Sequence, residues 1–76
     1  MKELVEYLAK NLVNNPDEVE IKEIECEKRI ILQLKVAPSD VGKIIGRGGK
    51  RVKAIRTLLS ATAAKISKRA ALDVLD

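Results

Sequence analysis

Two glycines spaced three residues apart, Gly46 and Gly49, interrupt a stretch of helical pattern and limit how this chain can fold. Because glycine has no Cβ, the chain can turn sharply there and a ligand can approach its backbone closely. The segment that follows begins a helix with two cations, Lys50 and Arg51. The first turn of a helix attracts anions through its unpaired N–H groups, and a cation there is unfavourable by about 0.3 to 1 kcal/mol. The loop is therefore predicted to bind a negatively charged ligand such as a phosphate backbone.

Charge is divided unevenly along the chain, although the formal net charge is only +4. Residues 1–40 carry six Lys or Arg and nine Asp or Glu, whereas residues 41–72 carry nine Lys or Arg and no acid. Most of these nine cations flank the glycine loop, as expected of a surface that binds a polyanion. They are Lys43, Arg47, Lys50, Arg51, Lys53 and Arg56. The alternative is an ordinary solvated surface.

Two other glycine-rich motifs, both of which bind nucleotides, do not fit this loop. A P-loop needs Ser or Thr after its Gly-Lys pair and another glycine five residues before that pair, but the chain has Arg51 and Ile44 there. The dinucleotide fingerprint Gly-x-Gly-x-x-Gly, started at Gly46, also meets Arg51 where its last glycine belongs, and it should follow a strand. A purely structural role, with Gly46 as a helix cap and Gly49 as a turn residue, explains the glycines but not the cations around them.

Composition excludes several classes of function. The chain has no His and a single Cys, Cys26, so neither an internal disulfide nor a His/Cys metal site is expected. For the same reason we expect no enzyme activity, cofactor or small-molecule substrate. The longest apolar run is far shorter than the roughly 20 residues of a membrane span, and no signal peptide is recognised, so a cytoplasmic protein is expected. Tyr7 is the only aromatic residue, which excludes modules that stack bases on aromatic platforms. We expect Cys26 to be a small buried hydrophobe and Tyr7 to be a packing residue.

Hydrophobic periodicity predicts one α+β domain over residues 1–76. Apolar residues recur three and four apart over about residues 2–14 and 50–67, as in amphipathic helices. A shorter helix is expected to begin at Pro38 and to end at Gly46. The glycine loop thus joins a short helix to a long one.

Two strands are predicted between the first helix and the short one, and a third at the end of the chain. Segments at about residues 19–26 and 29–36 alternate apolar and polar residues and are expected to pair as a hairpin. In the first of them the alternation shifts between Ile21 and Ile24, which indicates a bulge or an edge position. The last segment, about residues 70–75, contains two alanines of low strand propensity, so a strand and an extension of the long helix both stay open.

The order of these elements and the sequence around the loop resemble a KH domain, a module that binds RNA and single-stranded DNA. The resemblance rests on Ile-Ile-Gly, two residues, Gly and a basic helix, with the core of the motif at about residues 29–76. The whole chain resembles the small bacterial single-KH proteins (KhpA-like). This resemblance implies a type II KH fold, in which helices cover one face of a three-stranded mixed sheet.

The resemblance also implies a site and a function. KH domains clamp the backbone of about four nucleotides with the Gly-x-x-Gly loop. The residues implied for this clamp are Gly46, Arg47, Gly48, Gly49, Lys50, Arg51, Lys43, Lys53 and Arg56. Ile44, Ile45 and Val41 are candidates for an aliphatic groove that holds the bases. Some of the three are expected in the core, and at most one is expected to face a base. We expect a single-stranded RNA-binding protein, with single-stranded DNA as an open alternative, acting as an RNA chaperone or post-transcriptional regulator.

Partners follow from the size of this site and from the resemblance. A site for four nucleotides cannot specify a unique target, so a second copy is expected to add avidity. The KhpA-like resemblance implies pairing with itself or with a larger bacterial KH protein (Jag-like), and a link to cell division, cell shape and cell-wall synthesis. The alternative function is an assembly module with incidental nucleic-acid binding. It would use a stripe on the long helix made of Ala54, Leu58, Ala61 and Lys65.

Overall fold

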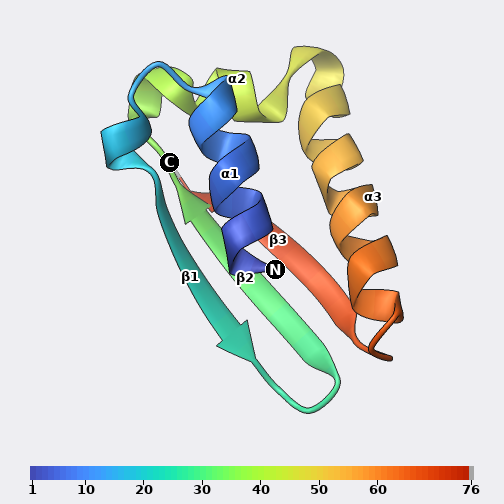
Figure 1. Cartoon of the computed structure of the whole chain (residues 1–76). Coiled ribbons are helices and arrows are strands. Elements are labelled where there is room, and N and C mark those ends of the chain that lie inside the picture. Colours follow the sequence, from blue (N-terminus) through green and yellow to red (C-terminus); the bar gives the residue numbers. More distant parts are fainter. Residues whose placement is uncertain (76) are drawn as a thin grey trace.

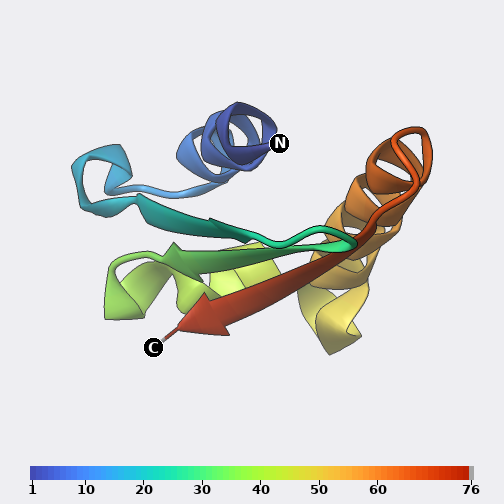
Figure 2. The same ribbon diagram turned by 90° about the horizontal axis from the view of Figure 1, so that it is seen from below.

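Three helices lie over one face of a three-stranded sheet in the computed structural model, which describes residues 1–75 (Figures 1 and 2). In chain order the elements are α1 (Lys2–Leu12), β1 (Glu20–Glu25), β2 (Arg29–Lys35), α2 (Val41–Ile45), α3 (Lys50–Ala64) and β3 (Arg69–Leu75). Single turns of 3₁₀ helix precede β1, α2 and α3, at Pro16–Glu18, Pro38–Asp40 and Arg47–Gly49. The predicted α+β class and the predicted order of helices and strands are confirmed.

The sheet has the strand order β1-β2-β3, so β1 and β3 are both edge strands. β1 runs antiparallel to β2, with Ile21 beside Leu34, whereas β3 runs parallel to β2, with Leu72 beside Leu32. Parallel strands need a crossover connection, which α2, the glycine loop and α3 supply together. This crossover places α3 beside the edge strand β3 (Figure 1).

The core lies between the helices and the inner face of the sheet. β2 supplies Ile30, Leu32 and Leu34, each at most 3% exposed, because alternate side chains of a strand point to the same face. The other elements supply Val5 and Ala9 from α1, Ile44 from α2, Val52, Ile55 and Leu59 from α3, and Leu72 from β3. Each large buried side chain contributes about 1.5 to 3 kcal/mol. This packing fixes α2 and α3, and therefore the loop between them.

The turn between α3 and β3 reverses the chain without a glycine. Ser67 has a φ of 58°, in the left-handed region. The N–H of Lys68 donates to the carbonyl of Ala63 at 3.0 Å, which closes the end of the helix. The N–H of Arg69 then donates to the carbonyl of Lys28 at 3.0 Å, in the hairpin turn between β1 and β2. The two turns are thus joined through the backbone.

The structure settles the questions that the sequence left open about the strands. The last segment is a strand, Arg69–Leu75, paired with β2, and not an extension of α3. The register of β1 with β2 is unbroken over Glu20–Glu25, so the shift in the alternation reflects an edge position and not a bulge. Ile24 faces away from the helices and is 37% exposed. α1 ends at Leu12 and α3 at Ala64, two and three residues earlier than predicted.

Two predictions about single residues are wrong. Cys26 lies beyond the end of β1, in the turn that leads to β2, and it is exposed instead of buried. Tyr7 lies on α1 but away from the face that buries Val5 and Ala9, and it is 67% exposed. Each prediction rested on the type of residue and its expected element, and neither could tell which face or end of that element the core covers. None of the helices among residues 1–75 is long and apolar enough to span a membrane.

Candidate nucleic-acid interface

The loop between α2 and α3 contains three glycines with positive φ angles, 77° at Gly46, 63° at Gly48 and 77° at Gly49. Residues with a Cβ rarely adopt such angles, so the loop depends on glycine. The N–H of Gly46 donates to the carbonyl of Gly42 at 2.9 Å and ends α2, and the N–H of Gly49 donates to the carbonyl of Gly46 at 3.1 Å. Arg47 and Gly48 are exposed at the tip of the loop.

The three loop glycines differ in what surrounds them. A Cβ at Gly46 would lie 2.5 Å from Cβ of Arg51 and 2.9 Å from its backbone nitrogen, which is too close for any side chain. A Cβ at Gly48 or Gly49 would meet no atom within 4 Å. Gly46 therefore lets the loop pack against the first turn of α3, whereas the other two leave the outer side of the loop open to a ligand.

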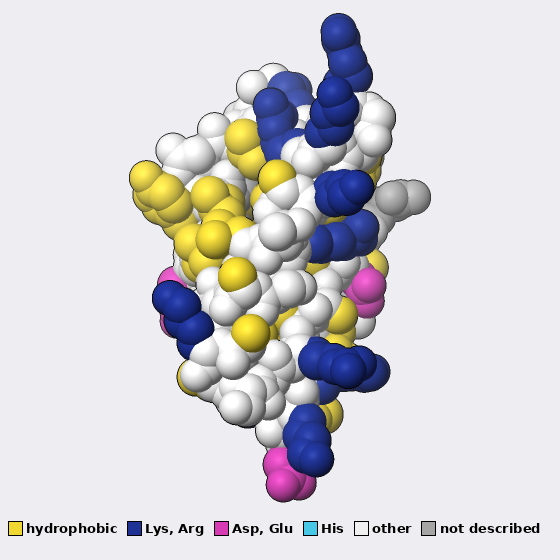
Figure 3. All heavy atoms as spheres, turned by 90° about the vertical axis from the view of Figure 1, so that its right-hand side faces the viewer, with side chains coloured by type: hydrophobic (Ala, Val, Ile, Leu, Met, Phe, Trp, Pro, Cys, Tyr) yellow, Lys and Arg dark blue, Asp and Glu magenta, His cyan; other side chains and the backbone are white. Residues whose placement is uncertain are grey.

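Arg47, Lys50 and Lys53 are the predicted cations that stay available for a ligand. All three are exposed, and no hydrogen bond or ion pair within residues 1–75 involves their side chains. A shallow depression of about 290 Å³ opens beside the loop, lined by Gly46, Arg47, Lys50 and Arg51. Figure 3 shows Lys and Arg side chains gathered at the top of the face formed by α3. This end of the molecule is suited to an anion.

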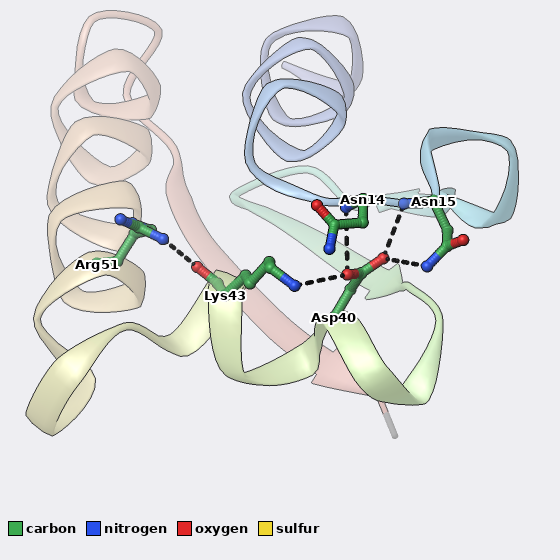
Figure 4. A network of polar contacts seen from close by, with 5 residues as sticks. All are labelled: Asn14, Asn15, Asp40, Lys43 and Arg51. Carbon is green, nitrogen blue, oxygen red and sulfur yellow. Dashed lines mark hydrogen bonds and ion pairs between the residues drawn. The ribbon is translucent and has the colours of Figure 1, made fainter.

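The other three predicted cations have partners within the protein. Arg51 Nη1 donates to the carbonyl of Lys43 at 2.6 Å, and the ammonium of Lys43 lies 3.4 Å from the carboxylate of Asp40 (Figure 4). The guanidinium of Arg56 donates from Nε and Nη2 to the carbonyl of Leu72, at 3.2 and 3.0 Å. These contacts tie α3 to α2 and to β3. The three side chains therefore hold the site together in the free protein.

Asp40 is fully buried at the start of α2. Its carboxylate accepts hydrogen bonds from the backbone N–H groups of Asn14 at 3.2 Å and Asn15 at 3.0 Å, and from the Asn15 side chain at 3.0 Å (Figure 4). Burial alone raises the pKa of Asp40, but the hydrogen bonds from Asn15, Asn14 and Lys43 outweigh it and leave the pKa below its usual value. The charged carboxylate thus links the segment after α1 to the helix that carries the glycine loop.

The three apolar candidates for a base-binding groove are not equivalent. Ile44 is fully buried and belongs to the core, so it is not accessible to a base. Val41 and Ile45 are half-buried and pack against the core from its border. Only these two expose surface near the loop, which agrees with the expectation that part of the set is core.

A second groove lies between α3 and the edge strand β3. Its volume is about 380 Å³, and it is lined by Arg56, Leu59, Ser60, Ala70, Ala71, Leu72 and Asp73. Of these residues, only Arg56 was predicted to be part of the site, because the sequence left the last strand uncertain and did not place it beside α3. The order strand, two helices, strand would have been a usable signal, since such crossovers pack the last helix back onto the parallel pair.

The family model described as "KhpA/KhpB, KH domain" matches residues 2–74. The chain belongs to this family. Three relatives, each named RNA-binding protein KhpA, cover nearly all of it. The protein of Clostridium acetobutylicum is 51% identical over 75 residues, 99% of this chain and 100% of the relative. That of Borreliella burgdorferi is 55% identical over 74 residues (97% and 90%), and that of Aquifex aeolicus is 45% identical over 76 residues (100% and 96%). No solved structure matches the chain.

Membership in the KhpA/KhpB family confirms the resemblance that the sequence analysis stated. The mixed sheet and the order of elements are those of the predicted type II KH fold. The family match includes both the glycine loop and the α3–β3 groove. Among residues 1–75 of this KH domain, no three His, Cys, Asp or Glu side chains lie together in a way that could hold a metal ion.

Proposed function

We propose that this chain, acting as a single KH domain, binds unpaired RNA and holds the phosphate backbone against the loop Gly46–Gly49. The observation that carries the proposal is the open outer side of the loop, where Gly48 and Gly49 have no atom within reach of a Cβ. A ligand backbone can approach these positions closely, next to the N-terminal end of α3, where anions are favoured. The relatives named RNA-binding protein KhpA support RNA as the ligand.

The cations divide into two roles in this proposal. Arg47, Lys50 and Lys53 are exposed and unengaged within the described residues, so they contact phosphates directly. Lys43, Arg51 and Arg56 shape the site through their contacts with Asp40, the end of α2 and β3, and they are available to a bound strand only in part. Phosphate contacts of this kind position a strand but carry no sequence information.

Bases are proposed to lie beside the loop and along the α3–β3 groove. Val41 and Ile45 offer aliphatic surface near the loop, and the groove continues from Arg56 toward Ser60. β3 is an edge strand, so one side of its backbone has no strand partner to bond. Bases must be unpaired to use such a groove, because the deep major groove of an A-form duplex keeps its base edges out of reach of side chains.

The wider role is proposed from the family and from the size of the site. We propose an RNA chaperone or post-transcriptional regulator in the cytoplasm, linked to cell shape and cell-wall synthesis. It would pair with itself or with a larger KH protein to gain avidity. An assembly role is the second candidate, because Ala54, Leu58 and Ala61 form an exposed stripe on α3 and Leu58 is 44% exposed. RNA affinity and oligomeric state measured on the same sample separate the two.

The test of the loop is Arg47→Asp together with Gly48→Asp. Both positions are exposed, no atom lies near a Cβ at position 48, and Asp tolerates a left-handed φ better than most residues. The two carboxylates repel phosphates, so binding of single-stranded RNA, measured by fluorescence anisotropy, should fall at least tenfold while circular dichroism stays unchanged. A matched control is Lys2→Asp with Asn11→Asp, which changes the charge equally on the exposed side of α1. Equal binding by both variants would refute the clamp.

A further inference from the structure

A second group of cations lies at the end of α3 opposite to the glycine loop. Two turns meet there, the hairpin turn between β1 and β2 and the turn between α3 and β3. The N–H of Arg69 donates to the carbonyl of Lys28 at 3.0 Å, and the ammonium of Lys68 pairs with the carboxylate of Glu25. The hydrogen bond and charge of Lys68 hold the pKa of Glu25 below its usual value. These contacts make the two turns one continuous surface.

Four cations on this surface are exposed. They are Lys28, Arg29, Lys65 and Arg69, and no hydrogen bond or ion pair of their side chains is found within residues 1–75. Glu27 is an exposed carboxylate in the hairpin turn, and Asp73, also exposed, lines the α3–β3 groove. Arg29 and Arg69 are register partners on neighbouring strands. Like charges side by side on a sheet are destabilising, and a bound anion would remove that cost.

The two cationic regions lie along the same side of the molecule. In Figure 3, one group of Lys and Arg side chains lies at the upper right of the face and another near its lower end, with an acidic side chain between them. The α3–β3 groove lies between the two regions, with Arg56 and Ser60 on one wall and Ala70 to Asp73 on the other. Arg29 and Arg69 project from the helix-free side of the sheet, because Ile30 faces the core and alternate side chains point to opposite faces.

The distance between the regions exceeds the reach of the loop clamp. α3 has 15 residues and therefore spans about 22 Å. If the strand keeps the spacing of about 3.4 Å per nucleotide that each strand has in a duplex, about six nucleotides lie between the two ends of α3. The loop itself clamps about four nucleotides. A strand that touches both regions is therefore about eight to ten nucleotides long.

We propose that the turns around Lys28–Arg29 and Lys65–Arg69 form a second phosphate-binding patch for the same single-stranded RNA, which leaves the glycine loop, follows the α3–β3 groove and curves around the N-terminal end of β3. This inference rests on the proposed function, since it extends that site. The ligand is an unpaired strand of about ten nucleotides and not an isolated tetranucleotide. Salt dependence should grow with strand length, because each phosphate contact adds about −0.7 to the slope of log affinity against log salt.

The test compares oligouridines of four and twelve nucleotides on the parent and on Arg29→Gln with Arg69→Gln. Binding is measured by fluorescence anisotropy at 50 and 200 mM salt. The tetranucleotide should bind both proteins equally. The twelve-nucleotide strand should bind the variant about five- to tenfold more weakly at the lower salt, with a slope less steep by about 1.4 for two lost contacts. At 200 mM salt the difference in affinity between the parent and the variant should largely disappear.

The comparison needs a correction for strand length and a matched control variant. A strand of twelve nucleotides offers about nine overlapping positions for a four-nucleotide site, so length alone raises apparent affinity up to about ninefold in every protein. The matched variant Lys2→Gln with Lys22→Gln removes the same charge from exposed positions on α1 and β1. It should bind both strands as the parent does.

The outcomes separate this patch from the loop. If the Arg29/Arg69 variant binds the long strand as the matched variant does, or weakens both strands equally, the second patch is wrong and the loop clamp still stands. If Arg47→Asp with Gly48→Asp leaves the tetranucleotide affinity intact, the proposed function itself fails. Thermal unfolding checks that the variant is folded. If it is unfolded, Lys28→Gln with Lys65→Gln takes its place. This variant should bind the tetranucleotide as the parent does and the twelve-nucleotide strand more weakly.

Discussion

The two ends of α3 turn the chain in different ways. At its start, three glycines have positive φ angles, although only Gly46 would meet a neighbouring atom if it carried a Cβ. At its end, Ser67 alone has a positive φ, in a turn held by the backbone bond from Arg69 and by the pair of Lys68 with a carboxylate. Reversal of the chain by itself thus does not require glycine. The open space around Gly48 and Gly49 is better explained by the close approach of a ligand.

The cations of α3 also fall into two groups, one bonded within the protein and one exposed to solvent. Arg51 and Arg56 each donate to a backbone carbonyl of another element, whereas Lys50 and Lys53, on the same helix, point into solvent. The sequence alone does not distinguish these four cations. The contacts in the structure show that Arg51 and Arg56 stabilise the fold, whereas Lys50 and Lys53 are free to contact phosphates.

The largest effect is expected from Gly46→Ala. The new Cβ would lie 2.5 Å from Cβ of Arg51, at a φ of 77°, so strain and crowding act together. We expect a loss of about 3 kcal/mol in the free energy of unfolding, measured by urea denaturation. Gly48→Ala is the control, because it carries only the left-handed φ and should cost about 1 kcal/mol. Equal losses at both positions would show that the contact with Arg51 does not distinguish the two glycines.

A smaller loss of stability is expected when a cation bonded within the fold is replaced by glutamine, and none when an exposed cation is replaced. Arg56→Gln removes both hydrogen bonds to the Leu72 carbonyl and should cost about 1 to 2 kcal/mol of stability. Lys53→Gln should leave stability unchanged but reduce the salt slope of RNA binding by about 0.7. Urea denaturation and binding titrations on both variants check this. The division is wrong if Lys53→Gln destabilises the fold and Arg56→Gln does not.

These contrasts show what the sequence could and could not predict. The element order, the glycine loop and the family followed from local signals, because periodicity and glycine spacing are properties of neighbouring residues. The partners of Arg51, Arg56 and Asp40 did not, since each contact joins residues that only the tertiary fold brings together. The α3–β3 groove was missed for the same reason. The strand propensity of Ala70 was too weak to place the edge strand that lines it.

Acid should weaken the end of the molecule that carries the glycine loop, through Asp40 at the start of α2. The pKa of Asp40 is lowered in the folded protein, so its contribution to stability is complete above the unfolded pKa of about 3.9 and is lost as pH falls through the folded pKa. Asp40→Asn should therefore be less stable than the parent at pH 7, and the difference should shrink below about pH 4. Thermal melts at several pH values measure it. Asp17→Asn, at an exposed position in the segment before β1, is the control for loss of a carboxylate. A difference that does not change with pH would mean that the charge of Asp40 is not what stabilises the site.

The smallest effect concerns the turn at the other end of the helix. Ser67 has a φ of 58°, which costs a residue with a Cβ about 1 kcal/mol, whereas glycine adopts it freely. Ser67→Gly removes this strain but increases the entropy of the unfolded chain, so a net gain of about 0.5 kcal/mol is expected. The same change at Ser60, inside α3, should instead cost about 1 kcal/mol, because the helical φ there gives glycine no advantage. Urea denaturation of both variants provides the comparison. If Ser67→Gly were destabilising, the serine side chain would itself hold the turn, and the contrast with the glycine loop would rest on side-chain contacts instead of backbone geometry.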